Sequence, residues 1–266
     1  MSLNRTVARM AVVSALNNYM VVPAAGSQWP TLAGPNIFDS KIEPVEDMKE
    51  DRAFPCCVVY TDYDKDHWSK GSSDSKNRMM TVTLELLIVQ VAETAPQTDE
   101  QGNVIPTKYT LETPFTDSEI ETTLDMFEVQ IFRALNANNK AADCFNYLCA
   151  AYDNVVSRRG ASIEGGVRLA ARQITLEMKT PRDPITGAIP VPIADFLNEL
   201  EQHGDYGDRV DDIRAMYTAT ASETAAERAA KAYGYARPLA KILGYEPGAE
   251  VVLPSNLTFV EVGNWR

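Results

Sequence analysis

FPCCVVYTDY at Phe54–Tyr63 and RMMTVTLELLIVQVAE at Arg78–Glu93 are the two stretches of this sequence that decide its fold. The first is an apolar run and the second is long, β-branched and alternating, so both predict β-strands. The polar segment Thr61–Lys76 connects them, and strands joined in this way usually pair antiparallel as a long-looped hairpin. The nearly continuous apolar centre of the first run predicts a central place in the sheet.

Helical periodicity follows this hairpin. Within Ser118–Leu135 the apolar residues recur every three or four positions, which predicts an amphipathic helix. They are Ile120, Leu124, Phe127, Ile131 and Leu135. A second helix is predicted over Ala141–Ala151, and Val167–Thr180 alternates again, with a half-buried strand from Ile174 onward. The order strand–strand–helix–strand describes a small open sheet packed on helices.

The N-terminal residues and a proline-rich stretch set the expected domain limits. Apolar spacing over Leu3–Tyr19 predicts an amphipathic helix and matches a secretory signal poorly, because the apolar core at Met10–Leu16 is short. Pro181–Pro192 holds four prolines and a glycine, which marks a boundary. We therefore expect one domain over residues 1–182 and a C-terminal extension over 183–266.

The extension differs in character from the first domain. A short helix is predicted over Ile193–Gln202, and the alanine-rich Ala219–Ala236 also favours helix. Leu257–Val262 is a candidate last strand. Seven acids stand against one Arg209 between positions 195 and 212, a charge run that is more typical of a solvated face than of a docking site.

Composition excludes several classes of protein. Of the 266 residues 45% are hydrophobic and 23% charged, as in ordinary globular proteins, and no apolar run is long enough to span a membrane. A net charge of −12 argues against tight nucleic-acid binding, because phosphates would be repelled. An acidic chain suits a passage through which DNA slides without sticking.

Four cysteines are present: Cys56, Cys57, Cys144 and Cys149. No CxxC spacing occurs among them, so the favoured interpretation is four reduced, buried thiols. A disulfide or a zinc site is the alternative.

Asp62, Asp64 and Asp66, followed by His67, are the weak candidates for a metal site. A calcium loop of this spacing needs glycine at its sixth position and glutamate at its twelfth, where this chain has His67 and Ser73. A solvated acidic hairpin loop is therefore favoured over metal binding. The loop nevertheless motivates one alternative function, a metal-dependent hydrolase.

Other catalytic signals are weak. Two histidines are too few for a multi-histidine metal site, and no phosphate-binding glycine motif occurs. Gly160–Glu164 approaches the nucleophile elbow but lacks its last glycine and its strand–turn–helix setting. We expect no enzyme activity and no cofactor.

Thr94–Phe115 is long for a plain connection. Its length predicts a projecting arm or an extended hairpin that touches a partner. Thr94, Tyr109 and Phe115 are the weak candidate contact residues in this arm.

Three segments together resemble the tail terminator, or tail-completion, proteins of tailed bacteriophages. They are Pro55–Thr61, the strand Thr81–Val91 with the helix Glu119–Leu135, and the late strand Ala171–Met178. The resemblance covers about residues 1–182, and residues 183–266 have no counterpart in it.

The resemblance implies an α/β (α+β) fold, a mixed or antiparallel sheet with helices on one side. It implies a homohexameric ring that caps the tail tube, stops its polymerisation and contacts a neck or head-completion protein, with DNA passing through the lumen. It places the chain in the virion, at the tail–neck junction, without contact to a membrane. The extension would contact sheath or neck proteins. Another head–tail connector or a minor tail protein is the alternative among structural proteins.

Overall fold

The computed structural model describes residues 3–40, 54–66, 78–94, 97–98, 104–105, 108–112, 118–159, 170–183 and 187–218. The predicted helix at Ala219–Ala236 and the predicted last strand at Leu257–Val262 lie outside these residues. So do His67 and Phe115.

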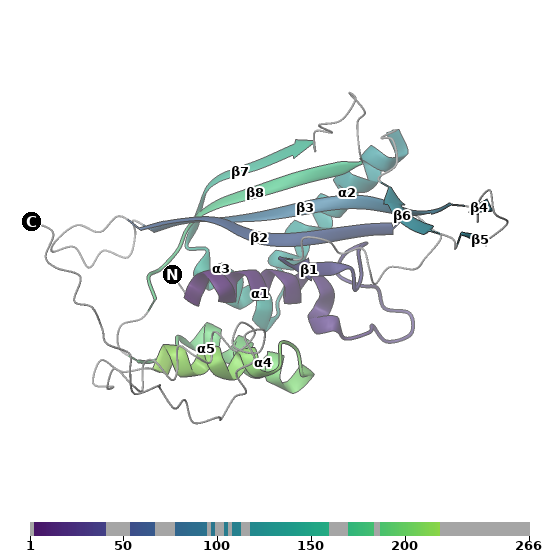
Figure 1. Cartoon of the computed structure of the whole chain (residues 1–266). Coiled ribbons are helices and arrows are strands. Elements are labelled where there is room, and N and C mark those ends of the chain that lie inside the picture. Colours follow the sequence, from purple (N-terminus) through teal and green to yellow (C-terminus); the bar gives the residue numbers. More distant parts are fainter. Residues whose placement is uncertain are drawn as a thin grey trace, which may run out of the picture. The chain divides into compact units, whose positions relative to one another are not determined.

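A mixed sheet forms the framework of the fold. Its strands, with two short additional ones, are β1 (Ile37–Asp39), β2 (Phe54–Asp66), β3 (Arg78–Thr94), β4 (Gln97–Thr98), β5 (Val104–Ile105), β6 (Lys108–Glu112), β7 (Ala151–Arg159) and β8 (Ala171–Lys179). The order across the sheet is β1-β2-β3-β8-β7 (Figure 1), and β6 pairs with the end of β3. Only β1 and β2 are parallel; the other pairs are antiparallel. The predicted α+β class and the antiparallel β2–β3 hairpin are confirmed.

β2 is longer than the sequence predicted. It is an inner strand, between β1 and the middle strand β3, and it continues through Asp66, where a polar connection had been expected from Thr61 onward. The extra residues pair with the start of β3, after a register shift between Thr61 and Tyr63. This shift is a β-bulge that leaves Asp62 as the additional residue on its strand.

The helices lie on one face of the sheet. They are α1 (Leu3–Asn17), the short 3₁₀ turn η1 (Asn18–Met20), α2 (Ser118–Leu135), α3 (Lys140–Leu148), α4 (Val191–His203) and α5 (Asp208–Thr218). Figure 1 shows α1 and α3 beside the sheet and α4 and α5 beyond them. The one-sided helix packing expected from the resemblance is therefore confirmed.

Local signals explain where α3 and α4 begin and end. The Asn139 side chain accepts a 2.8 Å hydrogen bond from the Ala142 N–H and caps α3. α3 ends at Leu148, earlier than the predicted Ala151, because the Ala150 N–H bonds to the Lys179 carbonyl of β8 at 2.9 Å and β7 starts. Gly204 ends α4 in the left-handed conformation, at φ 72°.

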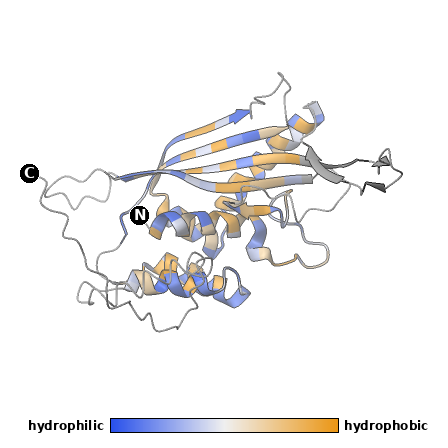
Figure 2. Cartoon of the chain, in the orientation of Figure 1, coloured by the Kyte–Doolittle hydropathy of each residue, from blue (hydrophilic) through white to orange (hydrophobic). Residues whose placement is uncertain are grey.

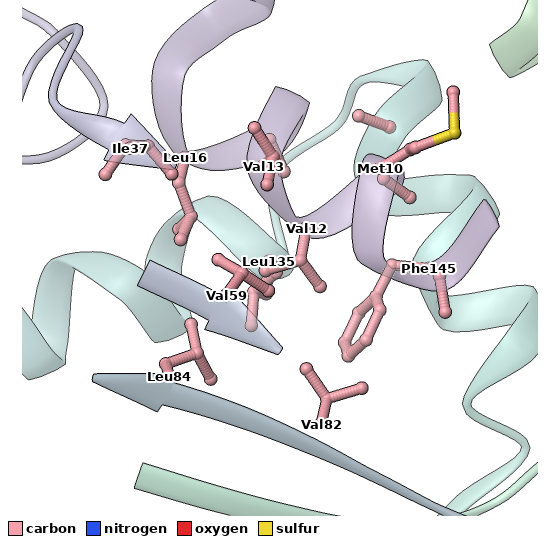
Figure 3. Packing of buried hydrophobic residues seen from close by; sticks show 14 of the residues in the cluster. Met10, Val12, Val13, Leu16, Ile37, Val59, Val82, Leu84, Leu135 and Phe145 are labelled. Carbon is pink, nitrogen blue, oxygen red and sulfur yellow. The ribbon is translucent and has the colours of Figure 1, made fainter. Parts of the chain in front are cut away.

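α1 is the centre of the core, not a surface helix. The sequence predicted an amphipathic helix, but eleven of its fifteen residues are buried. Figure 3 shows Val12 of α1 close to Val59 of β2 and Leu135 of α2, and all three belong to one hydrophobic cluster. The predicted helix is confirmed, but it is buried almost all round, because α2, α3 and α5 contact it in addition to the sheet.

α4 and α5 belong to the same compact unit as the sheet, which spans Met1–Thr220. Figure 2 shows hydrophobic bands on both helices, and Phe196 and Leu200 of α4 lie in the same hydrophobic cluster as α1. The boundary expected at 182/183 therefore falls inside one unit. A second unit covers Ala221–Arg266.

Candidate interaction surface

The three candidate metal ligands lie on β2 and not in a loop. Asp64 accepts two hydrogen bonds from Arg78, to Oδ1 from Nε at 2.9 Å and to Oδ2 from Nη2 at 2.6 Å. Asp62 is exposed at the bulge, and Asp66 is the last residue of the strand. No group of three His, Cys, Asp or Glu residues within the described ranges is arranged to hold a metal ion. Asp64 and Asp66 are two residues apart on the strand and share one face, whereas the bulge takes Asp62 out of this alternation.

Arg78 belongs to a structural junction instead. Its side chain is only 8% exposed, and its Nη1 lies 3.9 Å from the Asp183 carboxylate. Asp183 in turn accepts hydrogen bonds from the backbone N–H groups of Leu3 and Asn4, both at 3.0 Å. These bonds satisfy free donors at the start of α1, and the negative charge suits a helix N-terminus. The junction ties β2, β3 and α1 together.

The bulge at Asp62 is held by two arginines of α1. Arg5 donates from Nε to the Thr61 hydroxyl at 2.9 Å, and Arg9 donates from Nη1 to the same oxygen at 3.2 Å. Arg9 also forms an ion pair with Asp39 of β1. The basic residues that open the chain therefore have structural partners.

All four cysteines are buried, as predicted, and none of them forms a disulfide in this structure. Burial raises the pKa of the Cys56 thiol to about 12 and that of Cys149 to about 11, the latter against a hydrogen bond from Tyr152. Burial also raises the pKa of Cys57 and of Cys144. Such thiols carry almost no thiolate near neutral pH and are poor nucleophiles or metal ligands.

The last strand of the sheet, β7, presents an open edge. It pairs only with β8, and eight of its nine residues are exposed. Tyr152 and Val155 each keep 42% of their surface exposed on this strand. Among the described residues, no strand pairs with the outer N–H and C=O groups of β7. We call β7 with Tyr152 and Val155 the edge surface.

An ionic network behind the edge surface fixes it to α2. Arg172 of β8, with a side chain only 13% exposed, pairs with three acids of α2. These acids are Glu121, Asp125 and Glu128. From β7, Arg159 contacts Glu121 at 2.6 Å and Ser157 donates to Glu128 at 2.9 Å. The edge strand is therefore held in place from the helix side.

The predicted arm is an extended hairpin at the backbone level. Thr94 of β3 pairs with Lys108 of β6, and Glu93 pairs with Tyr109. β4 and β5 pair within the arm, and Figure 1 shows them beyond the end of the sheet. The proposed partner contacts of Thr94 and Tyr109 stay a prediction, and Phe115 lies outside the described residues.

No family model and no curated protein matches this chain. In the part of the chain that the structure describes, every helix is too short or too polar to cross a bilayer. What the chain does is therefore inferred from its own residues.

Proposed function

We propose that this chain is a structural virion protein of a tailed bacteriophage. It forms a homohexameric ring at the end of the tail tube, terminates tail polymerisation and joins the tail to the neck. Its partners are its own copies, the tail tube protein, a neck or head-completion protein and, through the C-terminal residues, the sheath. The resemblance noted above and the edge surface support this proposal.

The open edge of β7 is the observation that carries the proposal. Soluble monomers usually protect edge strands with charges, prolines or covering segments, because an open edge pairs with other chains. Here the edge is nine residues long; its charged residues are Asp153, Arg158 and Arg159, and its middle, Asn154–Ser157, carries no charge. Tyr152 and Val155 are exposed on this strand. An edge of this kind suits strand addition by a partner.

A ring needs two different surfaces on each subunit. A contact between unlike surfaces, repeated around an axis, closes a ring when the rotation closes. The arm formed by β3 and β6 begins at the far end of β3, and the edge surface lies on the last strand of the sheet. The arm of one subunit on the edge surface of the next would provide such a contact.

Charge is consistent with a passage for DNA. The net charge of −12 would keep a lumen wall from binding phosphates. Another head–tail connector would fit the same surfaces, and the position of a label on the virion distinguishes the two. The alternative of a metal-dependent hydrolase is less well supported, because Asp64 lies in a strand and forms an ion pair with Arg78.

The experiment is negative-stain imaging of the purified chain at high concentration, with two matched variants. We expect six-fold rings with a central hole in the unsubstituted protein. Val155→Asp places a charge on the edge surface and should abolish the rings. Val191→Asp changes a more exposed valine, 71% exposed at the start of α4, and should leave them intact.

Three outcomes would contradict the proposal or part of it. Monomers at every concentration, also after mixing with tail tubes, would exclude a ring component. If rings form with Val155→Asp but not with Val191→Asp, the contact between subunits does not use the edge surface. A label at the baseplate of the particle would exclude a place at the neck.

A further inference from the structure

A cleft of about 390 Å³ lies between α1, β1 and the turn that joins α4 to α5. Val13, Ser14 and Asn17 line it from α1, and all three residues of β1 line it from the sheet. Asp205 and Tyr206 line it from the turn. The size is that of a site for a small ligand or a short peptide. None of these residues belongs to the edge surface.

Buried polar atoms at this cleft lack partners. Ser14 is 1% exposed and Asn17 is 3% exposed. The Ser14 hydroxyl oxygen, Asn17 Oδ1 and the Tyr206 hydroxyl form no hydrogen bond in the described structure. Buried polar groups are nearly always hydrogen-bonded, so three unpartnered atoms in residues that line one cleft set it apart, although the atoms themselves are closed off from solvent.

One wall of the cleft is the free edge of β1. The Cys57 N–H bonds to the Asn36 carbonyl and the Ser40 N–H bonds to the Val59 carbonyl, both at 3.0 Å. In a parallel ladder alternate residues bond to the same neighbour, so Ile37 and Asp39 turn their backbone groups away from β2. β1 is the first strand of the sheet, and no described strand pairs with this side. Ile37 and Val13, from opposite walls, are labelled in Figure 3.

Backbone strain lies at the end of α1 beside the cleft. Asn18, Tyr19 and Met20 have φ angles of 50°, 53° and 55°, in the left-handed region that non-glycine residues avoid. Tyr19 stacks on His203 of α4 with ring centroids 5.1 Å apart, which holds the turn, and Met20 lines the cleft. Strain of this kind clusters at ligand sites.

We propose that this cleft binds an extended peptide segment of a partner protein, which adds to β1 as a new edge strand and places a Lys or Arg side chain between Asp39 and Asp205. The backbone groups of Ile37 and Asp39 would supply the main-chain hydrogen bonds. Val13 and Met20 would receive an apolar side chain. The proposal is independent of ring formation.

Charge selects a basic segment over an acidic one. Two carboxylates line the cleft, those of Asp39 and Asp205, and no lysine or arginine lines it. Asp39 is shared with Arg9, whereas Asp205 has no ion pair among the described residues. Burial raises the pKa of the Asp205 carboxyl, so a cation beside it would restore interactions that the carboxylate lost on leaving water.

The test adds two acetylated, amidated peptides to the full chain, Val-Lys-Val-Lys-Val and Val-Glu-Val-Glu-Val, and follows the methyl NMR signals of Val13, Met20 and Ile37. We expect saturable shifts with the lysine peptide only. Asp205→Asn should weaken its binding about two- to fivefold, as expected for a rim charge. The control Asp195→Asn changes an exposed carboxylate of α4 that pairs with Lys140 and should have no effect.

A third peptide tests the strand pairing. N-methylation of the central valine of the lysine peptide removes one backbone donor and blocks close approach, so affinity should fall about tenfold or more. The proposal is overturned if the lysine peptide shifts none of the three residues at millimolar concentration. Equal binding of the glutamate peptide, or of the N-methylated peptide, would also overturn it. An unchanged spectrum away from the cleft shows that Asp205→Asn still folds.

Discussion

The Tyr217 hydroxyl donates a 2.6 Å hydrogen bond to Asn4 Oδ1, a buried contact between residues 213 positions apart. Asn4 also donates from Nδ2 to the Pro181 carbonyl at 2.8 Å. One buried side chain at the start of α1 thus contacts both the segment after β8 and the last turn of α5. This contact explains why α5 belongs to the same compact unit as the sheet.

Removing this contact should destabilise the whole unit. Tyr217→Phe keeps the buried ring but leaves Asn4 Oδ1 without its partner, so we expect unfolding free energy to fall by about 1–3 kcal/mol. Urea unfolding followed by circular dichroism measures the change. Tyr147→Phe, at a residue that is 39% exposed on α3, is the control and should change little. If the two substitutions lower the unfolding free energy equally, the hydrogen bond between Tyr217 and Asn4 makes no special contribution to stability.

Asp64 should act in stability and not in metal binding. Asp64→Ala leaves the Arg78 guanidinium, 8% exposed, without its bidentate partner, so we expect a loss of about 2–4 kcal/mol. Asp62→Ala, at the exposed bulge, should change stability by less than about 0.5 kcal/mol. Calorimetric titrations with calcium, magnesium and manganese should be flat for the unsubstituted chain. Heat of binding that disappears in Asp64→Ala would restore the hydrolase hypothesis.

The Arg172 network should stabilise the folded chain, and this stability should depend on the charge and the shape of the side chain at position 172. Arg172→Met leaves Glu121, Asp125 and Glu128 close together without their shared cation, and we expect a loss of about 2–4 kcal/mol. Arg172→Lys keeps the charge but cannot bond to three carboxylates at once, so it should restore only part of the stability. The unfolding free energy of each variant in low and high salt checks this. Full rescue by lysine would contradict the role of guanidinium geometry.

Alkaline pH should destabilise the chain through its buried thiols. The Cys56 thiol has its pKa raised by burial from 9.0 to about 12, so above pH 9 the unfolded chain releases this proton first. Stability is then lost between these two values as pH rises, at about 1.4 kcal/mol per pH unit for each such thiol. Unfolding measured at pH 8, 9 and 10 under reducing conditions gives the slope. Cys56→Ala should make the slope shallower, and an unchanged slope would rule out this thiol as a contributor.

Substitutions in the left-handed turn after α1 should change the stability of the chain according to how well the new residue tolerates a positive φ angle. Met20, at φ 55°, is 49% exposed, so Met20→Gly removes strain and should raise the unfolding free energy by up to about 1 kcal/mol. Met20→Val should lower it, because a β-branched side chain tolerates this conformation least. Thermal unfolding compares the two variants. The same sign for both would mean that side-chain packing, and not backbone strain, dominates there.

Local periodicity in the sequence determined the elements of this protein: the hairpin of β2 and β3, the limits of α2 at Ser118–Leu135, and the strand after Ile174. Their patterns depend on neighbours a few positions away, which a sequence displays directly. Tertiary structure decided the surroundings of α1, because α2, α3 and α5 pack against it together with the sheet. It also decided the use of Asp64, because Arg78 meets it only when β2 and β3 pair. The edge surface and the cleft beside β1 likewise exist only once distant segments pack, because exposure and unpaired groups are properties of assembled elements and leave no period in a sequence.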